Sequence, residues 1–320
     1  MKLASGLFVL AFGLAAVQSA AAEDLFVTQY KNDPSGAPYG IALEKGFFKK
    51  HGVDITGIVS GAGGGASVRG AMATGVGYGD VSPAPAIAAI EQGQDIKITN
   101  ITSTSLALVQ IVMPNSPIKT AQDLKGKKIG ISNPKSLGEM MSVLVMEKAG
   151  LKQGDTQMVA LGSLSGALTA MENGAVDSTA IPVILYRMRG GDKKYRALIS
   201  GKDLPLLPPQ LGIATGKAMK EHPDQLKAIQ AARIEGTKFI YEHTDEAIKI
   251  LTKIYEPLPA DQVAAMVKDL VAVKFWSDGP IDVTLLENTV KAMKYVKMLD
   301  KDVDVKSLYT SAFLPANLQK

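Results

Sequence analysis

Two strand-to-helix turns with the same layout constrain the fold of this chain more than any other feature. In the first, a strand-like segment leads into a helix of small residues through the run Gly61-Ala62-Gly63-Gly64-Gly65-Ala66-Ser67. In the second, the corresponding run is Leu161-Gly162-Ser163-Leu164-Ser165-Gly166. Each turn leaves backbone N–H groups unpaired at a helix start, where the helix dipole also favours negative charge. The repetition predicts two facing lobes, although glycine would also permit two ordinary turns without a ligand.

The N-terminus has the composition of a secretory signal peptide. Lys2 precedes an apolar run over residues 7–17, and small residues up to Ala22 precede the acidic Glu23. This pattern predicts a signal peptide at residues 1–22, and its apolar run is short for a membrane span. The chain has no cysteine, which excludes a lipid anchor on cysteine, disulfides and thiolate sites. We therefore expect a protein released into the periplasm, not a lipoprotein.

The charge pattern excludes several classes of site. The formal net charge is +4, and the basic pairs are scattered without interleaved aromatic residues, so no nucleic-acid partner is expected. The three histidines are far apart in the sequence, and neither a metal-ligand cluster nor a Walker A motif is present. The sequence therefore predicts neither a metal nor a cofactor.

Strand-like and helix-like segments alternate along most of the chain. Strands are expected at residues 25–30, 53–55, 78–81, 96–101, 107–113, 128–132 and 178–182, and helices at residues 38–50, 83–90, 137–149, 223–241, 244–255 and 285–299. Such alternation predicts α/β lobes whose ligand lies beyond the carboxyl ends of the strands. Proline-rich breaks at residues 114–117 and 204–209 are expected near the crossings between lobes. The predicted domains are a signal peptide at 1–22, lobe I at 23–110 and 206–320, and lobe II at 111–205.

Five segments together carry a resemblance to a known family. They are Pro38-Tyr39-Gly40-Ile41-Ala42-Leu43-Glu44-Lys45-Gly46-Phe47-Phe48-Lys49-Lys50-His51-Gly52-Val53-Asp54-Ile55, Gly63-Gly64-Gly65, Gly79-Asp80-Val81-Ser82-Pro83, Leu124-Lys125-Gly126-Lys127-Lys128-Ile129-Gly130 and Asn173-Gly174-Ala175-Val176-Asp177. With them the chain resembles the periplasmic solute-binding proteins of ABC importers in the nitrate, sulfonate and taurine class, which also includes thiamine-pyrimidine binders. The resemblance implies a type II periplasmic binding fold, with two α/β lobes of mixed sheets joined by a crossover hinge. It also implies a protein that clamps a small solute and delivers it unaltered to an ABC permease in the inner membrane, and we expect this protein to be a monomer.

The resemblance also indicates which segments face the ligand. Backbone amides and serine hydroxyls at these turns could hold an oxyanion, so we expect an anionic solute of the sulfonate, nitrate or carboxylate type. Each serine could equally be an ordinary helix cap. Tyr39 and Arg69 are added as candidates for specificity, and Trp276 is expected away from the cleft. The predicted ligand-binding residues are Ser35, Gly36, Ala37, Tyr39, Gly64, Gly65, Ser67, Arg69, Ser82, Lys135, Ser136, Leu137, Gly162, Ser163, Ile181 and Pro182.

Four alternative functions remain in view. The spacing of Gly61, Gly63 and Ala66 matches a relaxed dinucleotide fingerprint, but the turn does not follow the first strand. Ser132 and Lys135 match an acyl-enzyme pattern whose other motifs are absent from the sequence. Thiamine-pyrimidine synthases share the implied fold, but they are cytosolic and use a cysteine-rich motif. A binding subunit that serves a chemoreceptor or another transporter would use the same clamp.

Overall fold

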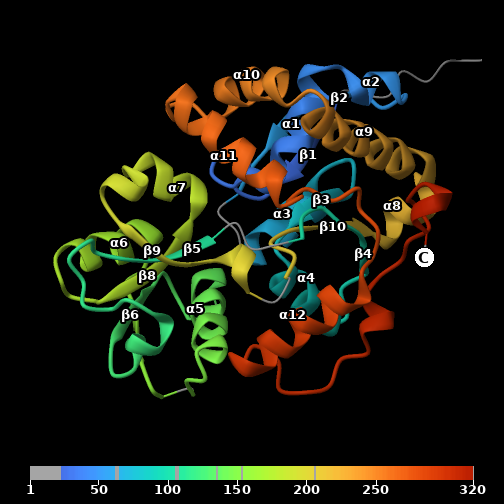
Figure 1. The fold of residues 1–320 in the computed structure, drawn as a ribbon. Helices are drawn as coiled ribbons and strands as arrows, with labels where there is room; N and C mark the ends of the chain where they lie inside the picture. The colour runs from blue at the N-terminus through green and yellow to red at the C-terminus, as the bar shows by residue number, and fades with distance from the viewer. Residues whose placement is uncertain are drawn as a thin grey trace, which may run out of the picture.

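The computed structural model describes residues 23–61, 65–104, 108–134, 136–152, 154–204 and 207–319. These residues form two α/β lobes side by side, each built on its own five-stranded mixed sheet (Figure 1). The first sheet has the order β2 (Ile55–Val59), β1 (Glu23–Val27), β3 (Tyr78–Val81), β10 (Leu211–Thr215) and β4 (Ile96–Ile101). The second has the order β7 (Gln157–Ala160), β6 (Lys128–Ile131), β8 (Ser178–Pro182), β5 (Leu108–Val112) and β9 (Arg196–Ser200). The predicted fold class is confirmed.

The two sheets have equivalent topologies. In each, three strands run parallel and the fourth is antiparallel to both of its neighbours. That fourth strand, β10 in the first sheet and β5 in the second, follows a crossing from the other lobe. The proposed domain boundary between residues 110 and 111 falls inside β5, all of which pairs in the second sheet.

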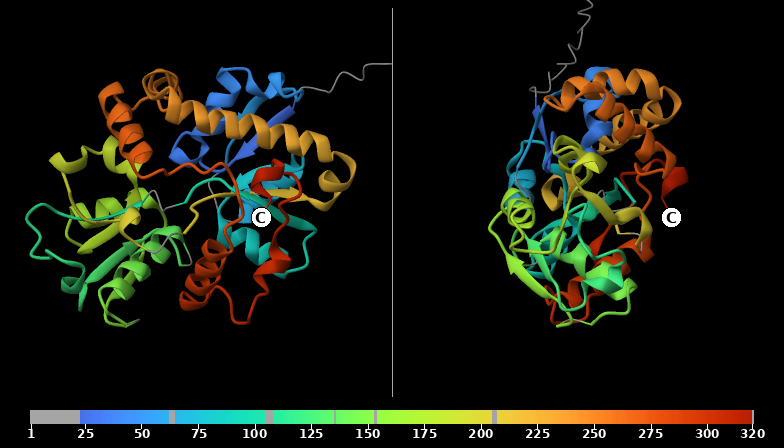
Figure 2. Two further views of the ribbon diagram at one scale, coloured as in Figure 1. Left: turned by 45° about the vertical axis from the view of Figure 1, so that its right-hand side comes forward. Right: turned by 60° about the vertical axis from the view of Figure 1, so that its left-hand side comes forward.

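The helices cover both sheets and the junction between them (Figure 2). Those on the first sheet are α1 (Ala37–Glu44), α2 (Phe47–Lys50), α3 (Gly65–Ala73), α4 (Pro83–Glu91), α8 (Gly216–Glu221), α9 (Pro223–Glu242) and α10 (Thr244–Ile254). Those on the second are α5 (Leu137–Lys148), α6 (Leu164–Glu172) and α7 (Val183–Met188). Two C-terminal helices contact both lobes: α11 (Ala260–Ala272) packs on α10 and α7, and α12 (Val283–Tyr295) packs on α4 and α5. Short 3-10 helices are η1 (Pro34–Gly36), η2 (Ala121–Leu124), η3 (Gly191–Lys193), η4 (Gly201–Asp203), η5 (Val305–Leu308) and η6 (Ala316–Leu318).

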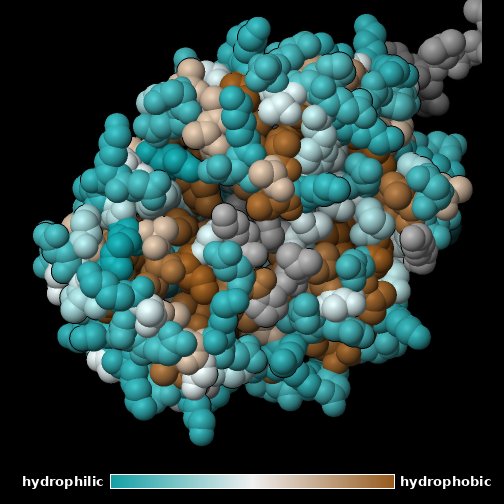
Figure 3. All heavy atoms as spheres, in the orientation of Figure 1, coloured by the Kyte–Doolittle hydropathy of each residue, from teal (hydrophilic) through white to brown (hydrophobic). Residues whose placement is uncertain are grey.

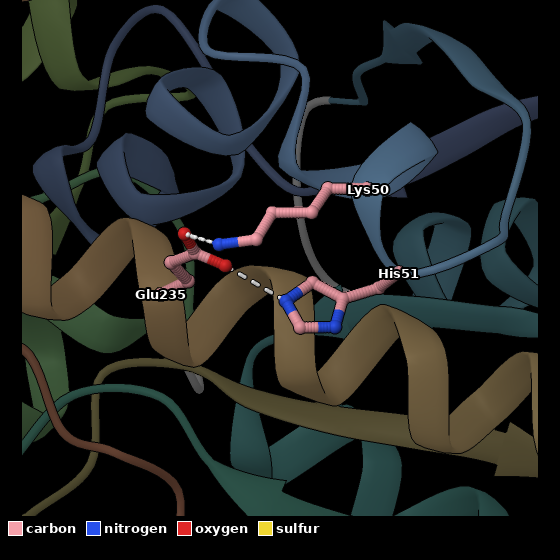
Figure 4. A network of polar contacts seen from close by, with 3 residues as sticks. All are labelled: Lys50, His51 and Glu235. Carbon is pink, nitrogen blue, oxygen red and sulfur yellow. Dashed lines mark hydrogen bonds and ion pairs between the residues drawn. The ribbon is translucent and has the colours of Figure 1, made fainter.

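The predicted helix over residues 38–50 is wrong in one respect, because it is two helices. Gly46 has a φ of 69°, a left-handed conformation that glycine adopts without steric cost, and it separates α1 from α2. The end of α2 is then tied to α9 by charged side chains (Figure 4). Lys50 Nζ donates to Glu235 Oε1 over 2.6 Å, and His51 Nε2 lies 2.8 Å from Glu235 Oε2. These contacts fasten the edge of the first lobe to its longest helix.

One apolar cluster runs through both lobes. It includes Phe26 and Val81 of the first lobe, Met140 and Leu144 of α5, and Leu285 of α12. The lobes are therefore packed together along the α5 and α12 side. Figure 3 shows hydrophobic residues in the inner part of the face it presents and a mostly hydrophilic rim.

Candidate functional site

A cavity of about 350 Å³ lies between the lobes, within the size range of small-molecule sites. It is reached from the carboxyl ends of β1 and β3 in the first lobe and of β6 and β8 in the second, as the alternating pattern predicts. Its described lining residues are Gln29, Asp33, Ser82, Pro83, Ala84, Pro85, Leu108, Ser132, Asn133, Pro134, Ser136, Leu137, Gly138, Met140, Leu164, Pro182, Leu207, Pro208 and Thr289.

The first-lobe wall begins where the chain leaves β1. Gln29 adopts a left-handed φ of 52°, and its carbonyl accepts from the amides of Asn32 and Asp33. Left-handed residues other than glycine are uncommon and often occur at functional sites. This tight turn places Asp33 at the cavity, with the start of α4 at Ser82 and Pro83 forming the rest of the wall.

Asp33 is a carboxylate held at the cavity in a largely buried position, with only 5% of its surface exposed. Its Oδ1 accepts from the Ser35 backbone amide over 2.8 Å, which caps η1. Burial raises the pKa of Asp33, and the contacts with Ser35 only partly offset that effect. A carboxyl in this position gains most from a partner that donates a hydrogen bond or carries positive charge.

The second-lobe wall consists of short turns after β6 and β8. Ser132, Asn133 and Pro134 lead to α5, whose N-cap Ser136 accepts from the Glu139 amide over 3.2 Å. The 12-residue helix α5 thus directs its N-terminus toward the cleft, where unpaired amides can act as donors. Pro182 closes this wall at the end of β8.

The remaining lining is mainly apolar and comes from the crossings and α12. Leu207 and Pro208 belong to the second crossing, and Leu108 begins β5. Met140 and Thr289 project from the two helices that join the lobes, α5 and α12. The cavity therefore combines a polar strip at the strand ends with an apolar surface beside it.

A buried polar network supports the first-lobe wall from behind. Tyr39 and Tyr78 share a 2.7 Å hydrogen bond between their hydroxyls, and Tyr78 donates to Asn100 Oδ1 over 3.1 Å. Gln230 Nε2 donates to the same oxygen over 2.6 Å. Arg233 is fully buried, and it donates to the carbonyls of Ser277 and Asp278 over 2.6 Å each. The network connects α1, β3, β4 and α9 to the segment that contains Ser277 and Asp278.

Asp80 is the acidic member of this buried region. It is fully buried, and burial raises its pKa to about 7. Nearby hydroxyls of Thr102 and Tyr39 and the charge of Arg233 act in the opposite direction, although neither carboxylate oxygen has a hydrogen-bond partner of ordinary geometry among the described residues. The backbone carbonyl of Asp80 accepts from the amide and from the hydroxyl of Thr28. These two hydrogen bonds hold the ends of β1 and β3 together.

The structure brings four of the predicted ligand-binding residues together at the cavity: Ser82, Ser136, Leu137 and Pro182. Gly64 and Lys135 lie outside the described residues. The others do not line the cavity, and they are Ser35, Gly36, Ala37, Tyr39, Gly65, Ser67, Arg69, Gly162, Ser163 and Ile181.

The residues that do not line the cavity fall into two groups. Ser35 and Tyr39 are fully buried behind the wall, and Ser67 is buried inside α3. Arg69, Gly162 and Ser163 are exposed outside the cavity. Ser163 accepts from the Gly166 amide over 2.9 Å, so this serine is a helix cap.

Sequence reasoning missed the residues that do most to define the cavity chemically. Asp33 belongs to the same turn as the predicted Ser35. An aspartate at this position is a capping signal, because its side chain can accept from the backbone amide two residues later. Asn133 stood beside the predicted Lys135. Thr289 carries no local signal, because only the packing of α12 brings it to the cleft.

Trp276 lies closer to the site than the sequence predicts. Its indole Nε1 donates to the Pro34 carbonyl over 2.7 Å, directly behind the turn that carries Asp33. It is only 3% exposed and does not line the cavity, so it supports the turn.

Comparison with known families agrees with this architecture. Residues 33–247 match the family model described as NMT1/THI5 like. The chain belongs to the NMT1/THI5-like family. The matched region includes Asp33, the starts of α4 and α5 and both crossings between the lobes.

Individual relatives and solved structures share only low sequence identity with this NMT1/THI5-like chain. A protein of Brucella abortus whose name describes it as a binding protein is 28% identical to this chain. The match covers 67% of this chain and 66% of that relative's length. The riboflavin-binding protein RibY of Chloroflexus aurantiacus is 22% identical over 87% of this chain and 82% of its own. The periplasmic aliphatic sulphonate-binding protein SsuA of Escherichia coli has a TM-score of 0.70 at 21% identity, covering 90% of this chain and 98% of its own. The likeness to SsuA is one of fold alone.

Two features are absent from the part of this family member that the structure describes. No group of three or more histidine, cysteine, aspartate or glutamate side chains in it is arranged to hold a metal ion. Within the same residues, no helix combines the length and apolar character that a membrane span requires.

Proposed function

We propose that this chain is the solute-binding component of an ABC importer, which clamps a small solute between its two lobes and releases it unaltered to a membrane permease. The observation that carries the proposal is one cavity with walls from both lobes, at the carboxyl ends of four strands. Membership of the NMT1/THI5-like family and the binding roles named for its relatives support it.

The physical requirement for such a clamp is a difference in contacts between open and closed forms. A solute that touched one lobe alone would bind both forms equally and would not favour closure. Here Asp33 and Ser82 face the cavity from one lobe, and Asn133 and Ser136 face it from the other. A solute bound to both sets favours the closed arrangement, a transition of the hinge type.

The compartment and the oligomeric state remain part of the proposal. Residues 1–22, which carry the predicted signal peptide, lie outside the described residues. We propose a periplasmic monomer whose partner is an inner-membrane permease, in keeping with SsuA, which is a periplasmic binding protein. A thiamine-pyrimidine precursor remains the alternative ligand, and a synthase-like enzyme remains the alternative activity.

The predicted preference for an anionic solute is not carried into this proposal. It rested on amides at helix starts, and α4 and α5 do begin at the cavity. However, the ionisable side chain among its described lining residues is acidic, and it is Asp33. An anion would have to approach that carboxylate.

The proposal is tested by blocking the cavity. The mature chain is screened against small solutes by thermal shift, because a ligand of the native state raises the apparent melting temperature. Asn133→Trp places a large ring at the exposed second-lobe wall and should abolish every shift. Asn173→Trp, at the exposed C-cap of α6, is the matched control and should bind as the wild type does. Undiminished binding by Asn133→Trp, or chemical change of the recovered solute, would contradict the proposal.

A further inference from the structure

Among the described residues that line the cavity, Asp33 alone has an ionisable side chain. The polar groups that share the lining are hydroxyls and amides: Gln29, Ser82, Ser132, Asn133, Ser136 and Thr289. The rest of the described lining is glycine and apolar residues. The hydroxyls and amides can donate as well as accept hydrogen bonds, so the Asp33 carboxylate sets the charge of the described lining.

Within the part of the chain that the structure describes, no ion pair neutralises the charge of Asp33. Among the described residues, no salt bridge includes Asp33. The buried cation of the first lobe, Arg233, is committed to the Ser277 and Asp278 carbonyls, and its charge acts on Asp80. The charge of Asp33 also contributes to the raised pKa of Asp80. A positive group supplied from the cavity would pair with a carboxylate that has no ion-pair partner among the described residues.

We infer that the cavity selects a small organic solute bearing a cationic nitrogen, such as an ammonium or amidinium group, which Asp33 binds while the apolar wall holds the solute's carbon body. This inference rests on the proposed function, since it specifies the solute class for the same site. A buried carboxylate binds a charged N–H donor more strongly than a neutral one, and it repels a carboxylate or sulfonate.

The neighbouring surfaces set the shape of the solute. Leu108, Met140 and Leu207 offer apolar surface beside the polar strip. A volume of about 350 Å³ leaves room for a ring or a short alkyl chain in addition to the charged group. Benzamidine and benzoate are suitable probes, because they have nearly the same planar shape and opposite charges.

Isothermal titration calorimetry of the full mature chain with both probes tests the inference. Wild type should bind benzamidine at least tenfold more tightly than benzoate. Asp33→Asn should weaken benzamidine binding about tenfold or more and leave benzoate binding equal or tighter. Asparagine retains an oxygen that can accept from the Ser35 amide, so the cap on η1 can persist, and circular dichroism checks the fold.

A gain-of-function variant makes the test independent of any folding defect at Asp33. Asn133→Asp adds a second carboxylate on the opposite wall and should tighten benzamidine binding severalfold. Asp54→Asn removes an exposed carboxylate outside the cavity and should change neither affinity. Preferential binding of benzoate by the wild type would overturn the inference and leave the proposed clamp intact. Failure of both probes, and of every solute in the thermal-shift screen, would contradict both.

Discussion

The two lobes have equivalent sheets but hold their sides of the cleft by different means. The first-lobe wall rests on a buried network that includes Tyr39, Asn100 and Arg233, all fully buried. The second-lobe wall rests on partly exposed turns, with Ser136 capping α5 locally. Buried hydrogen-bonded groups fix a single arrangement, whereas a local cap leaves a turn free to adjust. The comparison suggests one preformed half of the site and one adaptable half.

The largest expected effect concerns the titration of the first-lobe network. Asp80 has a folded-state pKa of about 7, above its ordinary value of 3.8, so the folded protein binds a proton more tightly than the unfolded chain does. The contribution of Asp80 to stability should therefore be fully present below about pH 4 and fall as the pH rises to 7, by on the order of 4 kcal/mol. The raised pKa of Asp33 acts in the same direction. Urea unfolding at a series of pH values measures this slope.

The control for this pH effect is Asp80→Asn, which keeps the size of the side chain and cannot titrate. It should remove most of the decline between pH 4 and pH 7. In the second lobe, Glu172 has a lowered pKa because Lys194 and Tyr195 contact its carboxylate. Its contribution has the opposite sign, since it is present above its ordinary pKa of 4.5 and is lost as the pH falls. An unchanged slope in Asp80→Asn would show that the first-lobe network is not its source.

The sequence predicted the fold well where local patterns coincide with tertiary structure. Strand residues 78–81, 96–101 and 178–182 were predicted with the bounds that β3, β4 and β8 have. These segments are buried and bounded by turn signals. The strands β9 and β10 and the helix α11 were missed, because β9 is only partly buried and β10 is identified by its pairing with β3 and β4, which are distant in sequence.

The site could be predicted only in outline. Turns at the carboxyl ends of strands were expected, and Ser82, Ser136 and Pro182 lie at the cavity. Which residue of a turn faces the cavity depends on backbone angles, and the left-handed Gln29 directs Asp33 there while Ser35 is buried behind it. A sequence pattern contains no signal for the left-handed conformation of Gln29 that decides which residue of the turn faces the cavity.

The next effect compares serine caps on the two walls. Ser136 caps α5 through its side chain, whereas Ser82 at the start of α4 makes no side-chain cap hydrogen bond. Ser136→Ala should lower the free energy of unfolding by about 1 kcal/mol, and Ser82→Ala by only about 0.3 kcal/mol. Urea denaturation of both variants measures the difference. Equal losses would indicate that the two walls do not differ in their reliance on local caps.

The smallest expected effect involves the ion pair that joins the lobes outside the cavity. Arg187 Nη2 of α7 lies 2.6 Å from Asp269 Oδ2 of α11, and the Asp269 side chain is 65% exposed. Exposed pairs contribute little, so Asp269→Asn should change stability by less than about 0.5 kcal/mol. Because the pair forms across the lobes, its loss should still speed solute dissociation about twofold at low salt, and salt at 0.5 M or above should remove that difference by screening the charges.

Asp224→Asn is the matched control for this last prediction. Asp224 pairs with Lys227 over 3.1 Å within α9, so the pair does not join the lobes and its loss should leave dissociation unchanged. Stopped-flow measurements with a bound solute separate the two variants. If Asp269→Asn and Asp224→Asn dissociate at the same rate at low salt, the ion pair has no part in closure. The contacts that favour the closed form would then lie elsewhere, at the cavity walls and in the packing of α11 on α7 and of α12 on α5.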